Sequence, residues 1–249
     1  MSTSCAVRFL GTGTSHGVPM IGCRCDVCRS TDPHDRRSRP SILFEPGNGA
    51  RVLVDTTPDL RSQALAHDLD RVDAILFTHC HADHVMGLDD VRRFNVLQRA
   101  AIPCYGDADT LKEIRRTFAY IFDAKDEGGG IPLVDLHAID GPFAVGGERF
   151  VPVPVWHGKR RILGFRVRDF AYLTDCSGIP DTSWPLLEGL DTLAIDALRH
   201  RPHSTHFTVE QAIGVAVRVG ARRTWLTHIC HDLPHAATNA SLPPGVAMA

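Results

Sequence analysis

The segment THCHADH carries the residues whose types and spacing are best suited to chemistry. His79, His81, Asp83 and His84 lie within six residues, directly after the apolar run DAILF. Imidazole and carboxylate groups are ligands that divalent transition metals prefer. One ion cannot easily use all four side chains in this geometry, whereas two neighbouring ions can if other parts of the chain complete each shell. The segment therefore predicts a site for two metal ions.

Further ligand candidates stand at the ends of other apolar runs. His157 follows PVW, Asp175 follows YLT, and His228 follows WLT. A single histidine beside a strand is more often a core or surface residue than a metal ligand. Each of these residues is therefore considered a ligand only because the THCHADH cluster is present. Together with that cluster, the three residues could complete two coordination shells.

Three thiols gather in the segment GCRCDVC, at Cys23, Cys25 and Cys28. Cys23 and Cys25 are too close for an easy disulfide, and clustered thiols favour a tetrahedral zinc ion that needs one more N or S ligand. The segment THICH offers His231 for this place, with Cys230 as the alternative. The other cysteines are scattered and no secretory leader is evident, so we expect reduced thiols and a cytoplasmic protein.

The spacing H-x-H-x-D-H resembles the signature of the metallo-β-lactamase superfamily. The resemblance runs along nearly the whole chain, from the GTGTSHG turn, through Asp55 at the end of RVLVD, to the WLTH segment. It implies an α/β fold of the four-layer αββα type, with the site at the sheet edges, and two divalent ions, Zn²⁺ or Mn²⁺. The implied ligands are His79, His81 and His157 for the first ion, Asp83, His84 and His228 for the second, and Asp175 as a bridge.

The CxCxxC segment and the THIxH ending together resemble one branch of this superfamily, which includes the phosphoribosyl 1,2-cyclic phosphate phosphodiesterase. This resemblance implies a structural Zn²⁺ held by Cys23, Cys25, Cys28 and His231. It also implies that His206, in HSTHFTVEQA, donates a proton to the leaving group. Similar cysteines occur in a relative from synthesis of the cofactor PQQ, so the cluster narrows the branch without fixing the substrate.

These features favour a phosphodiesterase that cleaves a small, cyclic phosphate ester with a metal-activated hydroxide. Asp83 would also orient the attacking water. His203 is the alternative proton donor and a candidate for binding the substrate. The basic triplet Lys159, Arg160 and Arg161 could bind a terminal phosphate or could form a solvated hairpin tip. Two other functions stay open: a tRNA 3′-end endonuclease, and a metalloprotein without hydrolytic activity that serves cofactor synthesis.

Composition limits the partners of this chain of 249 residues. The 27 Lys and Arg nearly balance the 29 Asp and Glu, which argues against nucleic acid as the default partner. No apolar run approaches the roughly 20 residues of a membrane helix, so we expect no membrane partner. The expected partner is a small phosphorylated substrate, with a homodimer as one alternative for the assembly. No domain boundary is evident, and one hydrolase domain over residues 1–249 is predicted.

Short apolar runs bounded by Gly, Pro or Asp predict the strands that must position these residues. They are AVRFLG, SILFE, RVLVDT, DAILFTH, FRVRDFAYLTD, TLAIDA and RTWLTH. Helices are expected at 58–67, 85–97, 110–120 and 208–219, the last with Thr208 as its cap. The glycine-rich segment 123–130 should be a surface loop, either a connector or a lid, and the tail SLPPGVAMA a loosely held end.

Overall fold

The computed structural model describes residues 5–123 and 130–249, which form two compact units. Unit 1 consists of Met1–Leu10 and Ser41–Glu148, and unit 2 of Gly11–Pro40 and Arg149–Ala249. One hydrolase domain over the whole chain stays a prediction. Of the 123–130 loop, residues 124–129 lie outside the described residues, so its role as a lid also stays a prediction. Within the described ranges, no helix has the length and apolar character to cross a membrane.

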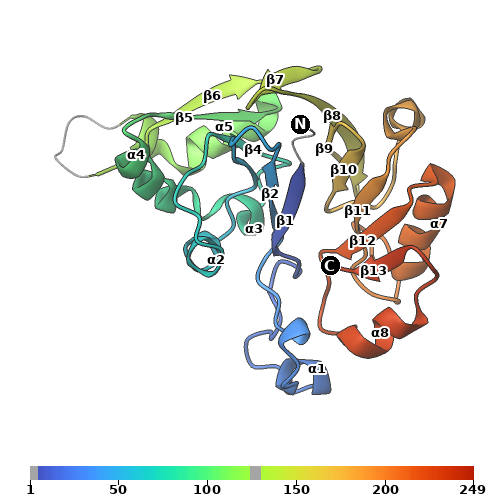
Figure 1. Cartoon of the computed structure of the whole chain (residues 1–249). Helices are drawn as coiled ribbons and strands as arrows, with labels where there is room; N and C mark the ends of the chain where they lie inside the picture. The colour runs from blue at the N-terminus through green and yellow to red at the C-terminus, as the bar shows by residue number, and fades with distance from the viewer. Residues whose placement is uncertain (1–4, 124–129) are drawn as a thin grey trace. The chain divides into compact units, whose positions relative to one another are not determined.

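Unit 1 contains one mixed sheet with the strand order β1-β2-β3-β4-β5-β6 (Figure 1). Strands β2 and β3 are antiparallel, and β3, β4, β5 and β6 run parallel to their neighbours. In the register of β3 with β4, Val54 lies opposite Leu76. The residues that follow these two strands therefore emerge at the same edge of the sheet. The strands are β1 (Ala6–Gly11), β2 (Ser41–Glu45), β3 (Val52–Val54), β4 (Ala74–Leu76), β5 (Ile102–Gly106) and β6 (Val134–Ala138).

The helices of unit 1 share one apolar core with this sheet. Leu60, Phe94 and Ile114, from three different helices, are buried in the same cluster as Leu53 and Ile75 from the strands. Burial of apolar side chains at about 25 cal/mol per Å² is the main force that fixes helices on a sheet. The helical segments are α2 (Leu60–Ala66), α3 (Ala82–Val85), η2 (Leu88–Val91), α4 (Arg92–Gln98), α5 (Ala108–Thr117) and α6 (Ala119–Phe122).

The chain leaves unit 1 through β7 (Phe143–Val145) and enters the sheet of unit 2, in which the strands follow the order β13-β12-β11-β10-β9-β8. Strands β8, β9 and β10 are antiparallel, whereas β10, β11, β12 and β13 are parallel. The ends of β10, β11 and β12 therefore lie at one edge. The strands are β8 (Glu148–His157), β9 (Arg160–Val167), β10 (Phe170–Leu173), β11 (Thr192–Asp196), β12 (Arg223–Thr227) and β13 (Val246–Met248).

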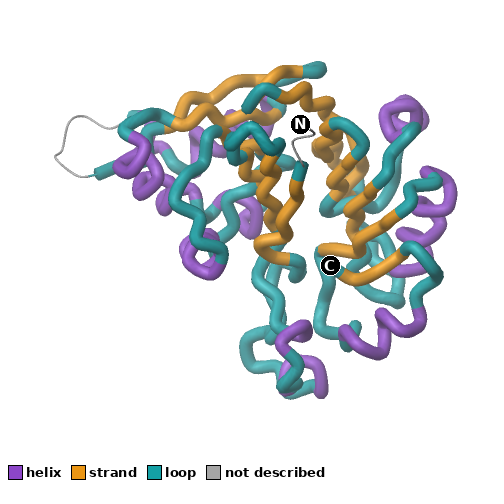
Figure 2. Tube along the Cα trace, in the orientation of Figure 1, coloured by secondary structure: helices purple, strands orange, loops and turns teal. Residues whose placement is uncertain are grey.

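Helix α7 (Val209–Val219) packs its apolar face on the sheet of unit 2, and the helices lie beside the strands in Figure 2. Thr208 caps the helix: its hydroxyl accepts from Gln211 N, and the Gln211 side chain accepts from Thr208 N. This capping box satisfies two backbone donors at the helix start. The other helical segments are α1 (Asp26–Arg29), η1 (Pro33–Asp35), η3 (Asp181–Leu187) and α8 (His235–Ser241).

Two parts of unit 2 differ from the sequence-based expectation. Strand β8 was not predicted from the sequence. Prolines usually mark the edge or end of a strand, whereas Pro152 and Pro154 lie inside this one. They are two residues apart, so their missing N–H groups fall on the same side of the strand. The expected loose tail is also wrong: Val246–Met248 pairs with β12, and Met248 is buried in the core.

Candidate metal centre and catalytic residues

In unit 1, the short helix α3 gathers the side chains of the THCHADH segment. His81 precedes the helix, and Asp83 and His84 lie within it. The ring centroid of His79 lies 4.5 Å from that of His81 and 4.2 Å from that of His84. His84 Nε2 lies 3.3 Å from an Asp83 carboxylate oxygen. The structure thus brings together all four residues that the sequence predicted from this segment.

A buried hydrogen-bond network orients two of these histidines. Asp55 accepts hydrogen bonds from Thr78 N at 2.9 Å, from Thr78 Oγ1 at 2.8 Å and from His84 Nδ1 at 2.7 Å. Since the Thr78 hydroxyl donates to Asp55, it accepts from His79 Nδ1 at 3.0 Å. Burial raises the pKa of Asp55, while His84 and Thr78 oppose that rise. The proton of both rings is thereby placed on Nδ1 and the lone pair on Nε2, the form that binds a metal.

In unit 2, three metal-ligand candidates stand at the ends of β8, β10 and β12. His157 donates from Nδ1 to the Thr205 carbonyl at 2.9 Å, which leaves the lone pair on Nε2. Burial lowers the pKa of His157, which favours this neutral form. Asp175 and His228 are buried, with His228 Nε2 3.4 Å from Asp175 Oδ2. The sequence predicted all three positions, and the structure places them in one unit.

Asp196, which the sequence interpretation missed, pairs with His206 in the same unit. His206 Nδ1 donates to Asp196 Oδ2 at 2.8 Å, and the buried carboxylate also accepts from Cys176 N at 2.7 Å. The His206 ring lies 4.6 Å from the His228 ring and 4.9 Å from the His157 ring. Asp196 comes directly after the apolar run LAI, just as Asp55 comes after VLV. A carboxylate at the end of a strand-like run is therefore the sequence signal that could have identified it.

Three of these residues have a left-handed backbone immediately after a strand. Asp55 has φ 65°, Asp175 has φ 53° and His228 has φ 60°. Asp and His are among the few residues other than glycine that adopt this conformation with any frequency. The sharp change of direction places each side chain at the edge of its sheet.

The register of the β8–β9 hairpin divides the basic triplet. His157 lies opposite Arg160, and Trp156 lies opposite Arg161. Directly opposite residues share a face of the sheet, so Arg160 lies on the face of His157 and Arg161 on the other. Lys159 is exposed in the turn. Binding of substrate by Arg160 or Lys159 stays a prediction.

The three clustered thiols of unit 2 converge on His231. The Nδ1 atom of His231 lies 3.2 Å from Cys23 Sγ, 3.4 Å from Cys25 Sγ and 3.6 Å from Cys28 Sγ. A tetrahedral zinc with Zn–S of about 2.3 Å and Zn–N of about 2.0 Å requires N to S separations of roughly 3.5 Å. The donor set therefore suits a structural Zn²⁺. The alternative ligand, Cys230, instead accepts a hydrogen bond from Asp232 N.

The GTGTSHG turn has a packing role. Gly13 N donates to the Ser38 carbonyl and Thr14 N donates to the Ile229 carbonyl. A side chain at Gly13 would place its Cβ 2.7 Å from the Arg37 carbonyl oxygen, so only glycine fits. These two amides are therefore used inside unit 2.

Comparison with known proteins gives consistent matches. The model of the beta-lactamase superfamily domain matches residues 50–229. The crystal structure of a new diphosphatase from the PhnP family is 45% identical and has a TM-score of 0.92, covering 99% of this chain and 95% of that chain. Coenzyme PQQ synthesis protein B of Methylorubrum extorquens is 31% identical over 222 residues, 76% of this chain and 72% of that protein.

One further relative carries a different name. A protein named octanoyltransferase from Porphyromonas gingivalis is 39% identical over 242 residues, which are 96% of this chain and 49% of that protein. The chain thus spans about half the length of this relative.

Proposed function

We propose, from the premise that this chain belongs to the metallo-β-lactamase superfamily of metal-dependent hydrolases, that it hydrolyses a small, cyclic phosphate ester. The premise rests on the family match over residues 50–229 and on the 45% identity to the PhnP-family diphosphatase. The expected metallo-β-lactamase fold is confirmed by the same structural match, and each unit supplies one mixed sheet with helices.

The family premise supports two divalent ions as part of the proposal. The ligands proposed for them are His79, His81, Asp83, His84, His157, Asp175 and His228. The hydrogen bonds of His79, His84 and His157 through Nδ1 support this assignment, because each fixes the tautomer in which Nε2 is the ligand atom. Two divalent ions, when bound, supply a water of lowered pKa and neutralise charge on the phosphoryl group. We propose Zn²⁺ or Mn²⁺ there, and one structural Zn²⁺ at the three thiols and His231.

The single observation that carries the proposal is the buried pair of His206 and Asp196. The carboxylate holds the ring through Nδ1, so Nε2 is the atom that can deliver a proton to the leaving oxygen. Asp196 stabilises the charged ring before transfer, as a carboxylate does for histidine in other hydrolases. Asp83 orients the attacking water in this proposal. Such an acid is of no use to a protein that only carries a metal.

The names of the relatives favour phosphate chemistry for this chain. The solved relative called a diphosphatase is matched over 95% of its length. The relative called an octanoyltransferase is matched over 49% of its length, and its name belongs to a protein about half of which this chain does not match. Similarity to the PQQ synthesis protein keeps a role in cofactor synthesis as the second candidate. A complete acid pair beside the ligands favours the first.

The test uses purified protein, stripped of metal and reloaded with Zn²⁺ or Mn²⁺. The loaded protein is assayed against a bis-aryl phosphodiester, a ribose cyclic phosphate, a nucleoside diphosphate ester, an octanoyl thioester and a precursor tRNA. We expect turnover of the small phosphate esters, highest for the cyclic ester. Absence of turnover of every phosphate ester with both metals would refute the proposal, and turnover of the thioester alone would favour acyl chemistry.

A further inference from the structure

The loop 199–206 of unit 2 holds the ring of His203 in one tautomer. Its Nδ1 atom lies 3.3 Å from Thr205 N and 3.1 Å from Thr205 Oγ1. The backbone N–H can only donate, so His203 Nδ1 is the acceptor and the ring proton is on Nε2. Desolvation, with the positive charges of His206 and Arg199, lowers the pKa of His203, which favours the neutral ring. His203 therefore presents a permanent N–H donor.

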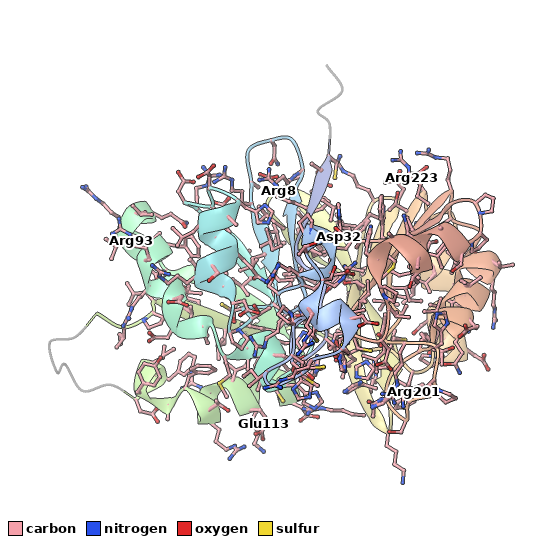
Figure 3. All side chains as sticks on the ribbon, turned by 90° about the horizontal axis from the view of Figure 1, so that it is seen from below. Arg8, Asp32, Arg93, Glu113, Arg201 and Arg223 are labelled. Atoms are coloured by element: carbon pink, nitrogen blue, oxygen red, sulfur yellow. The ribbon has the colours of Figure 1, made fainter. Side chains whose placement is uncertain are left out.

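The neighbouring basic side chains of this loop are engaged elsewhere. Arg199 donates to the carbonyls of Arg201 and Pro202. His200 pairs with Glu210 at 2.6 Å, and Arg201, labelled in Figure 3, pairs with Asp232 at 2.6 Å. The exposed His203 ring instead lies beside the His206 ring, with 5.1 Å between the centroids. The His203 ring thus lies next to the ring of the proposed proton donor.

Thr205 connects this donor to the ligand His157. Its amide and hydroxyl hold His203, while its carbonyl accepts from His157 Nδ1. The Thr205 methyl group would lie 2.9 Å from a Cβ placed at Gly158, so the loop packs closely on the β8–β9 turn. One residue therefore sets the relative placement of two histidines within unit 2.

We propose that His203 binds the substrate: its Nε2–H donates to a non-bridging oxygen of the phosphoryl group whose leaving oxygen His206 protonates. Thr205 is the residue that positions His203. The inference rests on the proposed function for its substrate class. A tetrahedral phosphoryl group can present one oxygen to each of two adjacent rings. Since negative charge grows on the non-bridging oxygens during reaction, this donor should act more on kcat than on KM.

The kinetic test compares H203A, H203Q and T205V in the metal-loaded full chain. A hydrogen bond to a charged group contributes about 10- to 100-fold, so H203A should lower kcat by about that factor and change KM by less than about threefold. H203Q keeps an N–H donor at a similar reach and should recover much of the loss. T205V removes only the hydroxyl. It should slow the reaction about threefold as a single substitution and should cause no further loss when it is combined with H203A. H200Q, on the same loop, is the matched control and should behave as wild type.

Two measurements separate this inference from the proposed function. Histidine ¹⁵N spectra of the folded protein should show His203 protonated at Nε2 only, both in wild type and in T205V, which keeps the backbone N–H that donates to Nδ1. Inorganic phosphate carries more negative charge than the ester substrate, so its calorimetric binding to the metal-loaded protein should weaken about tenfold in H203A even where KM changes little. If wild type turns over no phosphate ester but phosphate binding responds in this way, the proposed function fails and the donor role stands. Unchanged kcat and phosphate binding in H203A, or an Nδ1-protonated ring, would refute the role of His203.

Discussion

The substitution D196N tests the acid pair with the smallest change of shape. The carboxamide that results can still accept from His206 Nδ1 and from Cys176 N, the two donors that contact Asp196 Oδ2. Only the negative charge beside the ring is lost. Unit charges about 4 Å apart attract by about 4 kcal/mol at an effective dielectric near 20, which is an upper bound for this pair. Because 1.36 kcal/mol is a factor of ten in rate, the charged ring should be disfavoured by about 10²- to 10³-fold.

The assay compares two esters with the same phosphoryl group and different leaving groups. An alkoxide must be protonated as it leaves, so D196N should lower kcat for an alkyl phosphodiester by about 10²- to 10³-fold. A nitrophenolate leaves without a proton, so the loss for the nitrophenyl ester should stay below about tenfold. H206A should show the same dependence on the leaving group. D191N is the matched control, because Asp191 pairs with Arg222 at the surface and should affect neither ester.

Equal losses for the two esters would refute the assignment of His206 and Asp196 as the proton-donating pair. Thermal unfolding of D196N must accompany the kinetics, since Asp196 also holds the backbone at Cys176. A lower unfolding midpoint with a dependence on the leaving group still supports the pair. A lower midpoint with equal losses would indicate a purely structural carboxylate.

Two further predictions concern unit 2. C25S should remove one zinc per chain and lower the free energy of unfolding by about 3 kcal/mol or more, which corresponds to a fall of roughly 6 to 12 °C in Tm. The control C5S should keep the wild-type zinc content and Tm. If C25S kept its zinc and its Tm but lost turnover, the thiols would be part of the reaction. Burial, with Arg37 and His34 nearby, lowers the pKa of His235 from 6.5, so the unfolded chain takes up its proton first. The stability from this group is therefore complete above about pH 6.5 and is lost as the pH falls below it. H235N should lose less stability than wild type between pH 7 and 5 in urea unfolding, by up to about 1.4 kcal/mol per pH unit; parallel curves would contradict this.

Much of the site could be predicted because its residues follow recognisable strands. The continuous apolar runs in RVLVD, DAILFTH and WLTH mark buried strands, and within each sheet the ends of neighbouring parallel strands meet at one edge. What could not be predicted needs tertiary contacts. Cys25 and His231 are 206 residues apart, and only the tertiary structure shows that His231, 3.4 Å away, lies beside this thiol.

The elements that were missed contain residues that oppose their local propensity. Pro152 and Pro154 hide β8, although this strand carries His157. The tail contains two prolines and a glycine, but Val246–Met248 pairs as a strand and Met248 is buried. In both cases packing against a neighbouring strand outweighs the signal from single residues.

The left-handed backbone at Asp55, Asp175 and His228 also limits which side chains these three positions can carry. A side chain such as Cys, Met or Glu would cost about 1 to 2 kcal/mol in that conformation, whereas Asp, Asn and His tolerate it. Random substitution at Asp175 and His228, the two of these residues proposed as metal ligands, is therefore filtered towards oxygen and imidazole donors. Cys25, by contrast, has an ordinary φ of −67°, where a thiol carries no such penalty. At the strand ends the backbone thus favours oxygen and imidazole side chains, whereas at Cys25 it admits a thiol, whatever drift occurs in the rest of the sequence.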